Sequence, residues 1–271
     1  MKNLKHFIKG IIIGIATLVP GVSGGTMSLI LGVYDDMIHA VSGFFKDIKK
    51  NFKFLAVIGS GGVVGIVAFS KIITYGLDHF HFPVIYFFLG VIFAGIPVLY
   101  KEANKGKEKG KKKTDYLFFA IGVILIVVMS LYNGTIINLA GSTGIFNFIF
   151  LIVAGIIIAV ALILPGISTS FMLLALGLYD ITLNAINHVQ LDYLVPICIG
   201  ALIGVIATTK ILENCLTNKP RPTYLLILGF VLGSIIQVFP GLPIGLDIIW
   251  SIVTFILGYV MIYYMSKKYS D

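Results

Sequence analysis

Charged side chains are scarce in this chain of 271 residues, since 12% of its residues are Asp, Glu, Lys or Arg and 58% are hydrophobic. The mean hydropathy is +1.02. This composition excludes a soluble globular domain and is typical of a polytopic, all-α membrane protein. The formal net charge of +8 therefore concerns orientation in a membrane bilayer and gives no indication of a nucleic-acid partner.

Cysteine is equally rare, because Cys198 and Cys215 are the two present. Neither lies at metal-binding spacing from other ligand-type residues, so we expect no disulfide framework, no metal site and no resident cofactor. The five histidines are scattered, and neither a nucleophile–base arrangement nor a phosphate-binding P-loop is present. These absences disfavour an enzyme. The basic start of the chain lacks a small-residue cleavage site, so we expect it to remain in the mature protein.

One short phrase occurs twice within the apolar runs. The first copy is Leu-Val-Pro-Gly-Val-Ser-Gly-Gly-Thr at 18–26, and the second is Ile-Leu-Pro-Gly-Ile-Ser-Thr-Ser-Phe at 163–171. Each copy is followed at the same interval by Leu-Gly-x-Tyr-Asp, at 31–35 and 176–180. A Pro-Gly break exposes backbone polar groups that lipid cannot satisfy, so each break must lie in protein or face a wet cavity.

The duplication predicts two repeats, 1–135 and 145–271, which together cover nearly the whole chain. The first arm of the first break has ten apolar or small residues and covers about 15 Å, roughly half the hydrocarbon thickness. We therefore expect each repeat to begin with a re-entrant helical hairpin, at 7–45 and at 145–187. Three spans follow in each repeat, predicted at 54–73, 83–100 and 116–132, then at 193–212, 223–239 and 248–265. Identical residues keep register between the repeats: Gly65 with Gly204, Lys71 with Lys210, Pro83 with Pro222 and Gly90 with Gly229.

The distribution of basic residues predicts the orientation. A hairpin adds no crossing and each repeat adds three, so the second repeat is inverted relative to the first. With both termini cytoplasmic, 18 of the 20 Lys and Arg residues fall on the cytoplasmic side and none falls in an outside loop. This satisfies the positive-inside rule and predicts a multi-pass membrane protein with both termini cytoplasmic.

Inverted repeats with broken helices at mid-membrane are typical of secondary transporters. The second arm of each hairpin starts just after Pro-Gly, where N–H groups without helical partners and small hydroxyl residues favour an anion such as phosphate. A simple kink relieved by packing, or a cation bound by the carbonyl ends of the first arms, are the alternatives. The candidate phosphate-binding residues are Pro20, Gly21, Ser23, Gly24, Gly25 and Thr26 in the first copy, and Pro165, Gly166, Ser168, Thr169 and Ser170 in the second.

Five charged residues are further candidates. Lys71 and Lys210 lie inside spans and could receive an anionic head group, one near each face, although snorkelling to lipid head groups explains them equally well. Asp35 and Asp180, which end the duplicated tails, and the weaker candidate Glu213 could take a proton or sodium and so couple transport. For Asp35 and Asp180, the alternative is a solvated position at the base of a hairpin.

Residues 19–26 and 164–168 resemble the bacterial polyprenyl-phosphate transporter family PopT, long known only as a domain of unknown function. The resemblance covers nearly the full length. It implies translocation of undecaprenyl phosphate, the lipid carrier of wall-polymer precursors, from the outer to the inner leaflet. Two departures matter: many members have an acidic residue where this chain has Thr17, and glycine where it has Thr169. If that acid couples transport in the family, this chain couples elsewhere, and Thr169 narrows the second site.

The physics of the substrate agrees with this resemblance. A prenyl tail can stay in lipid, so the phosphate alone needs a polar path. The phosphate has a charge of about −1.5 to −2, and moving it against an inside-negative potential costs about 2.3 kcal/mol per charge per 100 mV. Net retrieval thus requires cytoplasmic consumption of the carrier or cotransport of a cation, and we expect dependence on a proton or sodium gradient. A secondary transporter of a small soluble anion is the main alternative; a membrane scaffold and an intramembrane phosphatase are weaker ones, and homo-oligomerisation is left open.

Overall fold

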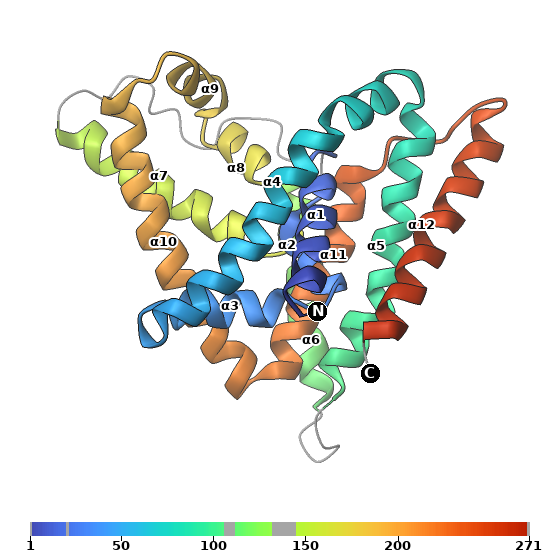
Figure 1. Ribbon diagram of the computed structural model, residues 1–271, viewed down its shortest axis with the longest axis horizontal. Coiled ribbons are helices and arrows are strands. Elements are labelled where there is room, and N and C mark those ends of the chain that lie inside the picture. Colours follow the sequence, from blue (N-terminus) through green and yellow to red (C-terminus); the bar gives the residue numbers. More distant parts are fainter. Residues whose placement is uncertain (1, 20–21, 106–111, 132–144, 270–271) are drawn as a thin grey trace.

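The computed structural model describes residues 2–19, 22–105, 112–131 and 145–269, and this part of the chain is helical without strands (Figure 1). Seven of its helices are long and apolar enough to cross a membrane. This confirms the predicted all-α polytopic class. The seven are α4 (Ile48–His79), α5 (His81–Ala103), α6 (Tyr116–Leu131, preceded by the 3-10 turn η3, Lys113–Asp115), α7 (Ile145–Ile163), α10 (Leu191–Asn218), α11 (Pro220–Val238) and α12 (Asp247–Tyr269).

Shorter helices surround the two copies of the repeated phrase. Around the first copy these are α1 (Lys2–Thr17), α2 (Gly24–Ile30), α3 (Tyr34–Ser42) and the 3-10 turn η1 (Phe44–Lys46); after the second copy they are α8 (Thr169–Ala175) and α9 (Tyr179–Asn187). The predicted second arms are thus each divided into two helices. Gly32 and Gly177 cause this division, because their φ angles of +63° and +68° end α2 and α8 in the left-handed region. The same pair of backbone hydrogen bonds closes both helix ends, a Schellman motif in each case.

One sequence prediction needs correction. The loop predicted at 74–82 is almost entirely helical, since α4 runs to His79 and α5 starts at His81. The helices continue past their apolar runs because nothing in that stretch breaks a helix before Phe80. Seven helices are long and apolar enough to cross a membrane, and six of them overlap the predicted spans. The additional one is α7, an uninterrupted apolar run that sequence reasoning treated as the first arm of the second hairpin.

Closely packed glycines join the helices in pairs, with equivalent contacts in the two halves of the chain. α1 crosses α4, where a Cβ added to Gly61 would lie 2.2 Å from the carbonyl oxygen of Phe7. α7 crosses α10, where a Cβ added to Gly200 would lie 2.0 Å from the carbonyl oxygen of Ile152. Because no real Cβ approaches this closely, both crossings require glycine.

A second set of glycine contacts joins the halves to each other. α12 packs on α5, where a Cβ added to Gly90 would lie 2.0 Å from the carbonyl oxygen of Phe255. α6 packs on α11 in the matching way, and there the Cβ of Gly229 would lie 2.3 Å from the carbonyl oxygen of Phe119. Each half therefore provides a helix to the other half's bundle. α5 and α11 also contact each other, and they are the most buried of the seven long helices.

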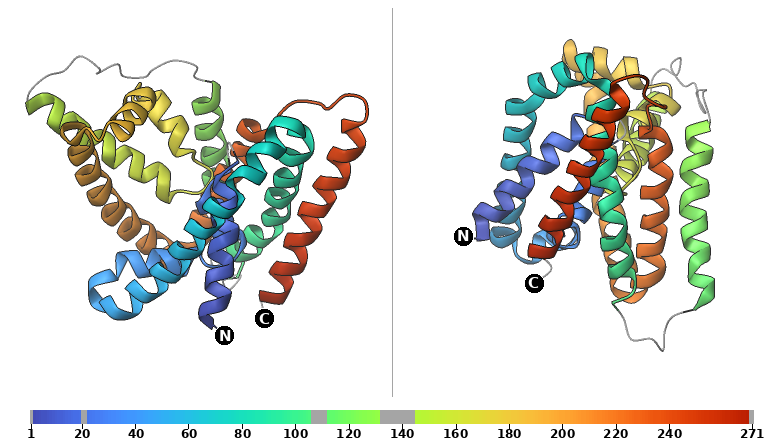
Figure 2. Two further views of the ribbon diagram at one scale, coloured as in Figure 1. Left: turned by 45° about the horizontal axis from the view of Figure 1, so that its top comes forward. Right: turned by 90° about the vertical axis from the view of Figure 1, so that its right-hand side faces the viewer.

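The pairs splay apart like a V in Figure 1, with α7 and α10 in one arm and α1 and α4 facing them. Two faces of the molecule can be followed in Figures 1 and 2. The N-terminal face holds the start of α1, α3 and the α10–α11 connection; the α9 face holds α9 and the α4–α5 and α11–α12 connections. α1 to α3 turn back toward the N-terminal face, and α7 to α9 turn back toward the α9 face, so the two turns meet near the middle of the molecule (Figure 2).

Candidate functional site

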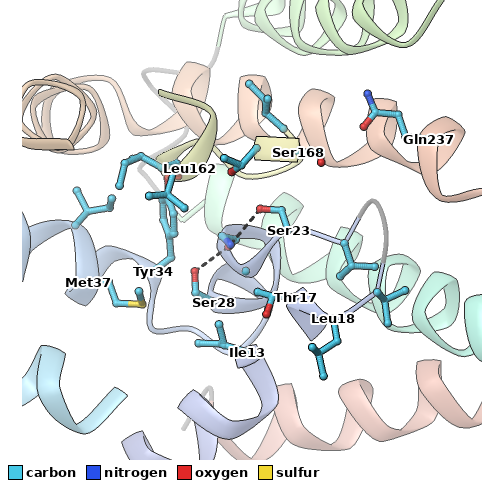
Figure 3. Close-up of a pocket in the computed structure, with 18 of the residues that line it drawn as sticks. Ile13, Thr17, Leu18, Ser23, Ser28, Tyr34, Met37, Leu162, Ser168 and Gln237 are labelled. Carbon is cyan, nitrogen blue, oxygen red and sulfur yellow. Dashed lines mark hydrogen bonds between the residues drawn. The ribbon is translucent and has the colours of Figure 1, made fainter. Parts of the chain in front are cut away.

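A cavity of about 920 Å³ lies where the two copies of the repeated phrase meet. Five of the predicted phosphate-binding residues line it: Ser23, Gly24 and Gly25 from the first copy, and Ser168 and Thr169 from the second. Figure 3 shows Ser23 and Ser168 reaching the cavity from different segments of the chain. The structure therefore brings residues far apart in the sequence to one site.

Most polar residues of the cavity were not among the predicted site residues. None of the described residues that line it is charged, so an anion here would be held by hydroxyls, an amide and backbone N–H groups. The position of the two tyrosines in the duplicated Leu-Gly-x-Tyr-Asp tails is a signal that could have identified them. Thr17 stands where the resembled family often has an acidic residue, and the other three have no such signal. The polar lining residues that were missed are Thr17, Ser28, Tyr34, Tyr179, Thr209 and Gln237.

Ser23 caps the start of α2 and lines the cavity. Its Oγ accepts a hydrogen bond of 3.1 Å from the N–H of Gly25, and Ser28 donates to the carbonyl of Gly25 at 2.8 Å (Figure 3). The N–H of Gly25 is thus already used within the protein. A serine hydroxyl can donate while it accepts, so the proton of Ser23 is available to a ligand in the cavity.

Direct hydrogen bonds tie the two copies of the phrase together. The N–H of Gly166 donates to Oγ1 of Thr26 at 3.0 Å, and the phenol of Tyr34 donates to the carbonyl of Ile163 at 2.8 Å. Thr26 is buried and, like Gly166, does not line the cavity. Gly166 has a φ angle of +80°, and its Cβ would lie 2.6 Å from the backbone of Phe230. Thr26 and Gly166 therefore join the hairpins and do not face a ligand.

The other predicted site residues lie elsewhere. Pro20 and Gly21 fall outside the described residues, and Ser170 is in the first turn of α8. Pro165 is buried beside Gly25 and does not line the cavity. Lys71 on α4, Lys210 on α10 and Asp180 on α9 are exposed and also lie away from the cavity lining.

The remaining two candidates, Glu213 and Asp35, join the halves at the N-terminal face. Glu213 of α10 contacts Nδ1 of His39 on α3 at 2.5 Å and accepts a hydrogen bond from Ser42. Asp35 of α3 accepts a hydrogen bond from the phenol of Tyr224 on α11. These contacts fasten α3 of the first half to two helices of the second half.

The environment of Asp35 changes its acidity. Although its side chain is partly exposed to solvent, the pKa of its carboxyl is raised above the ordinary value, chiefly because neighbouring protein removes some of the water around it. The negative charges of Glu102 and Asp36 raise this pKa further, whereas the hydrogen bond from Tyr224 and the nearby His39 lower it. Asp35 therefore takes up a proton at a higher pH than a free aspartate does.

Comparisons with known proteins agree with the geometry. Residues 13–249 match the family model described as undecaprenyl phosphate translocase-like. The chain is 36% identical to a polyprenyl-phosphate transporter of Staphylococcus aureus, over 94% of this chain and 93% of the relative. It is 28% identical to a polyprenyl-phosphate transporter of Vibrio cholerae, over 89% of this chain and 79% of the relative. No solved structure matches the chain. The match over most of its length shows that this chain belongs to the undecaprenyl phosphate translocase-like family.

Proposed function

We propose that this protein moves undecaprenyl phosphate from the outer to the inner leaflet of the bacterial cytoplasmic membrane, which returns the carrier lipid for envelope synthesis. The observation that supports this most directly is the single cavity at which both copies of the repeated phrase present hydroxyl groups. The names of the two relatives, both polyprenyl-phosphate transporters, support the class of substrate. The chemistry of the lipid itself is unchanged, so the protein acts as a transporter and not as an enzyme.

The phosphate binds in the cavity through neutral donors. Ser23 contributes from the first copy of the phrase, and Ser168 and Thr169 contribute from the second. Hydrogen bonds to a charged group are worth about 1.5–3 kcal/mol each, so a few hydroxyls can replace part of the phosphate's hydration. Neutral donors also suit a carrier that must release its ligand, because a buried ion pair would hold the phosphate more tightly. The prenyl tail remains in lipid beside the protein.

The two halves form an inverted repeat, and each Pro-Gly turn lies within the bilayer as a re-entrant hairpin. The matching glycine crossings at Gly61 and Gly200, and at Gly90 and Gly229, support the duplication. The concentration of Lys and Arg at the chain ends and in the 101–113 stretch supports a cytoplasmic position for the N-terminal face. The cavity at the hairpin turns is then the mid-membrane site at which the head group crosses.

A cation gradient drives the inward step. Moving a phosphate inward costs about 2.3 kcal/mol per charge per 100 mV, which cotransport of H⁺ or Na⁺ offsets. Of the three coupling candidates, Asp35 is supported most strongly, because its raised pKa favours proton uptake and it joins the two halves through Tyr224. Glu213 is held by His39 and Ser42. Asp35 and Asp180 are both exposed, so the contact of Asp35 with Tyr224, and not its burial, distinguishes the two.

Lys71 and Lys210 attract the lipid head group before it binds in the cavity. Both are exposed on long helices outside the cavity lining, where an ammonium group can attract an anionic head group at the membrane surface. Their exposed positions fit recruitment better than the direct binding first predicted from the sequence.

The test is lipid translocation by the purified protein in liposomes. Undecaprenyl phosphate is placed in one leaflet, and its arrival in the other is measured with a phosphate-binding reagent that cannot cross the membrane. We expect movement that exceeds protein-free liposomes and that excess inorganic phosphate does not abolish, with the lipid recovered intact. Competition by inorganic phosphate without lipid movement would instead indicate a transporter of small soluble anions. Release of free phosphate from the lipid would indicate a phosphatase.

A further inference from the structure

Equivalent residues of the two hairpins are buried to very different extents. Leu29 of α2 is 6% exposed, whereas its counterpart Leu174 of α8 is 51% exposed. Ile38 of α3 is 4% exposed, whereas its counterpart Leu183 of α9 is 46% exposed. Because the paired residues are similar in size and hydrophobicity, the difference reflects what each hairpin packs against and not its composition.

The packing partners account for this difference. α3 packs on α10, the long helix of the other half, and the contacts of Glu213 with His39 and Ser42 belong to this interface. The equivalent interface would join α9 to α4. In the described part of the chain, α9 packs on α8 and α10 and has no comparable packing on α4. Thus the N-terminal face is closed across the two halves and the α9 face is not.

The duplicated tyrosines differ in the same way. Tyr34 is buried and its phenol donates to the carbonyl of Ile163, at the start of the second copy of the phrase. Tyr179, its counterpart, is half-buried and lines the cavity. The counterpart of Ile163 is Leu18, which also lines the cavity. Tyr34 and Ile163 line the cavity too, so duplication supplies a second tyrosine and a second backbone carbonyl in matching positions, with all four residues at the cavity.

We propose that Tyr34 and Tyr179 are exchanging positioning residues of the transport cycle. In the structure described here Tyr34 holds the Ile163 carbonyl and the N-terminal face is closed. In the alternative state Tyr179 donates to the Leu18 carbonyl, α9 packs on α4, and the Tyr34 bond and the α3–α10 interface open. This inference rests on the proposed transport of a lipid phosphate, since it supplies the second access state that such transport needs.

The exchange keeps the energies of the two states close. One phenol–carbonyl bond is broken while an equivalent one forms, and one buried apolar helix face replaces another. Both tyrosines line the cavity in this structure, with the Tyr34 phenol bonded to the Ile163 carbonyl. In the alternative state the Tyr179 phenol is bonded and the Tyr34 phenol is released. In each state one phenol is thus bonded to a backbone carbonyl, and the other phenol can donate to the head group as a neutral donor.

Cross-linking distinguishes the two states without any lipid. The background is the full chain with Cys198→Ala and Cys215→Ala, treated with a short bifunctional thiol reagent. The first reporter is Ser42→Cys with Glu213→Cys, a pair in contact in this structure. The second is the equivalent pair across α9 and α4, Asn187→Cys with Thr74→Cys. We expect the first pair to cross-link readily and the second to cross-link in a measurable fraction of molecules.

Two conservative variants test the direction in which the ratio of second-pair to first-pair cross-linking changes. Tyr34→Phe removes the bond present in this structure, so it should raise the ratio of second-pair to first-pair cross-linking by about two- to tenfold. Tyr179→Phe should lower the same ratio by a similar factor. Opposite shifts support exchange. Shifts in the same direction would show that the phenols only stabilise the fold, and absence of second-pair cross-linking even with Tyr34→Phe would overturn the alternative state.

The outcomes for transport are separable from those for exchange. Opposite cross-linking shifts in a protein that moves no undecaprenyl phosphate would leave the exchange standing and refute the proposed function. Lipid movement without second-pair cross-linking in any background would leave the proposed function standing and refute the exchange.

Discussion

The two hairpins, α1–α3 and α7–α9, share a sequence pattern and differ in their surroundings. Both break at Pro-Gly and again at Leu-Gly, and both second breaks close with the same Schellman hydrogen bonds. Yet α3 is packed across the molecule on α10, and α9 has no equivalent contact with α4. Local structure therefore follows the repeat, whereas the packing of the hairpins is unequal. If closing one of these interfaces opens the other, a protein built of two similar halves can form only one of them at a time.

The chemistry of the two faces differs as well. At the N-terminal face, Glu213 meets His39, and both are ionisable. The counterpart of Glu213 is Thr74, and the counterpart of His39 is Asn184, so an equivalent contact at the α9 face would be neutral. Salt and pH should therefore act mainly on the interface that is closed here. Exposed ion pairs contribute at most about 1 kcal/mol, so this bias is small but confined to one face.

The largest loss of stability is expected at the glycine crossings, where the two halves are most alike. Gly61→Val and Gly200→Val would each force a side chain into the backbone of the neighbouring helix, at Phe7 and at Ile152. Overpacking of this kind costs about 3 kcal/mol or more. We expect both variants to lose the folded, monodisperse state, as measured by thermal unfolding in detergent with size-exclusion chromatography.

Gly59→Val is the matched control on the same helix as Gly61. A Cβ at Gly59 would meet nothing within 4 Å, so this variant should unfold at nearly the temperature of the unsubstituted protein. If Gly61→Val proved harmful and Gly200→Val harmless, the two halves would not share the crossing. If all three variants behaved alike, the close helix approach itself would be contradicted.

The sequence predicted the repeated elements well because their signals are local. Proline, glycine and the length of each apolar run locate the helices to within a few residues, as at the predicted span 223–239 and the observed α11. The shared cavity of the two phrases also follows from locality, since equal breaks in equal arms end at equal depth. Ser23 and Ser168 were identified on that basis, and both line the cavity.

What the sequence did not predict depends on contacts between the halves. Thr26 and Gly166 look like ligand-binding residues in the phrase, but they bond to each other. Thr209 and Gln237 look like ordinary residues of apolar helices, but they line the cavity. Repeat symmetry treats the hairpins as equal, so it contains no information about which of the two is packed across the molecule.

An intermediate effect is expected at the two serines of the cavity. Ser23→Ala and Ser168→Ala should each lower the rate of undecaprenyl phosphate translocation by about tenfold or more, because a hydrogen bond to a charged group is worth about 1.5–3 kcal/mol. Ser23→Ala also removes the cap of α2, which costs a further ~1 kcal/mol of stability. Its unfolding temperature should therefore fall while that of Ser168→Ala changes less.

Ser60→Ala serves as the control for both serine variants. Ser60 is exposed on α4 and donates to a carbonyl of its own helix, so its loss should leave translocation unchanged. Equal losses from Ser23→Ala and Ser168→Ala would show that both hairpins hold the phosphate. Loss from one alone would assign the phosphate to that hairpin, and normal rates in both would remove the cavity as the binding site.

The smallest effect is expected at the duplicated aspartates, in the pH dependence of transport. The groups that act on Asp35 are Tyr224 of α11, Glu102 of α5, and His39 and Asp36 of its own helix. Their combined result with the loss of water is a raised pKa. As the pH falls, Asp35 therefore protonates before a solvated carboxylate does, and as the pH rises it loses that proton only above the ordinary aspartate range.

Replacing each aspartate by asparagine compares the two hairpins directly. Asp35→Asn keeps an oxygen that can accept from Tyr224 but cannot titrate, so the change in translocation rate with pH through the raised pKa should disappear. We expect the rate itself to change by only a few-fold, the size of one altered hydrogen bond. Asp180→Asn should keep the pH dependence of the unsubstituted protein. Rates measured in liposomes of set internal pH decide the matter: if Asp180→Asn alone abolished the dependence, coupling would belong to the second hairpin, and if neither did, His39 would be the next group to replace.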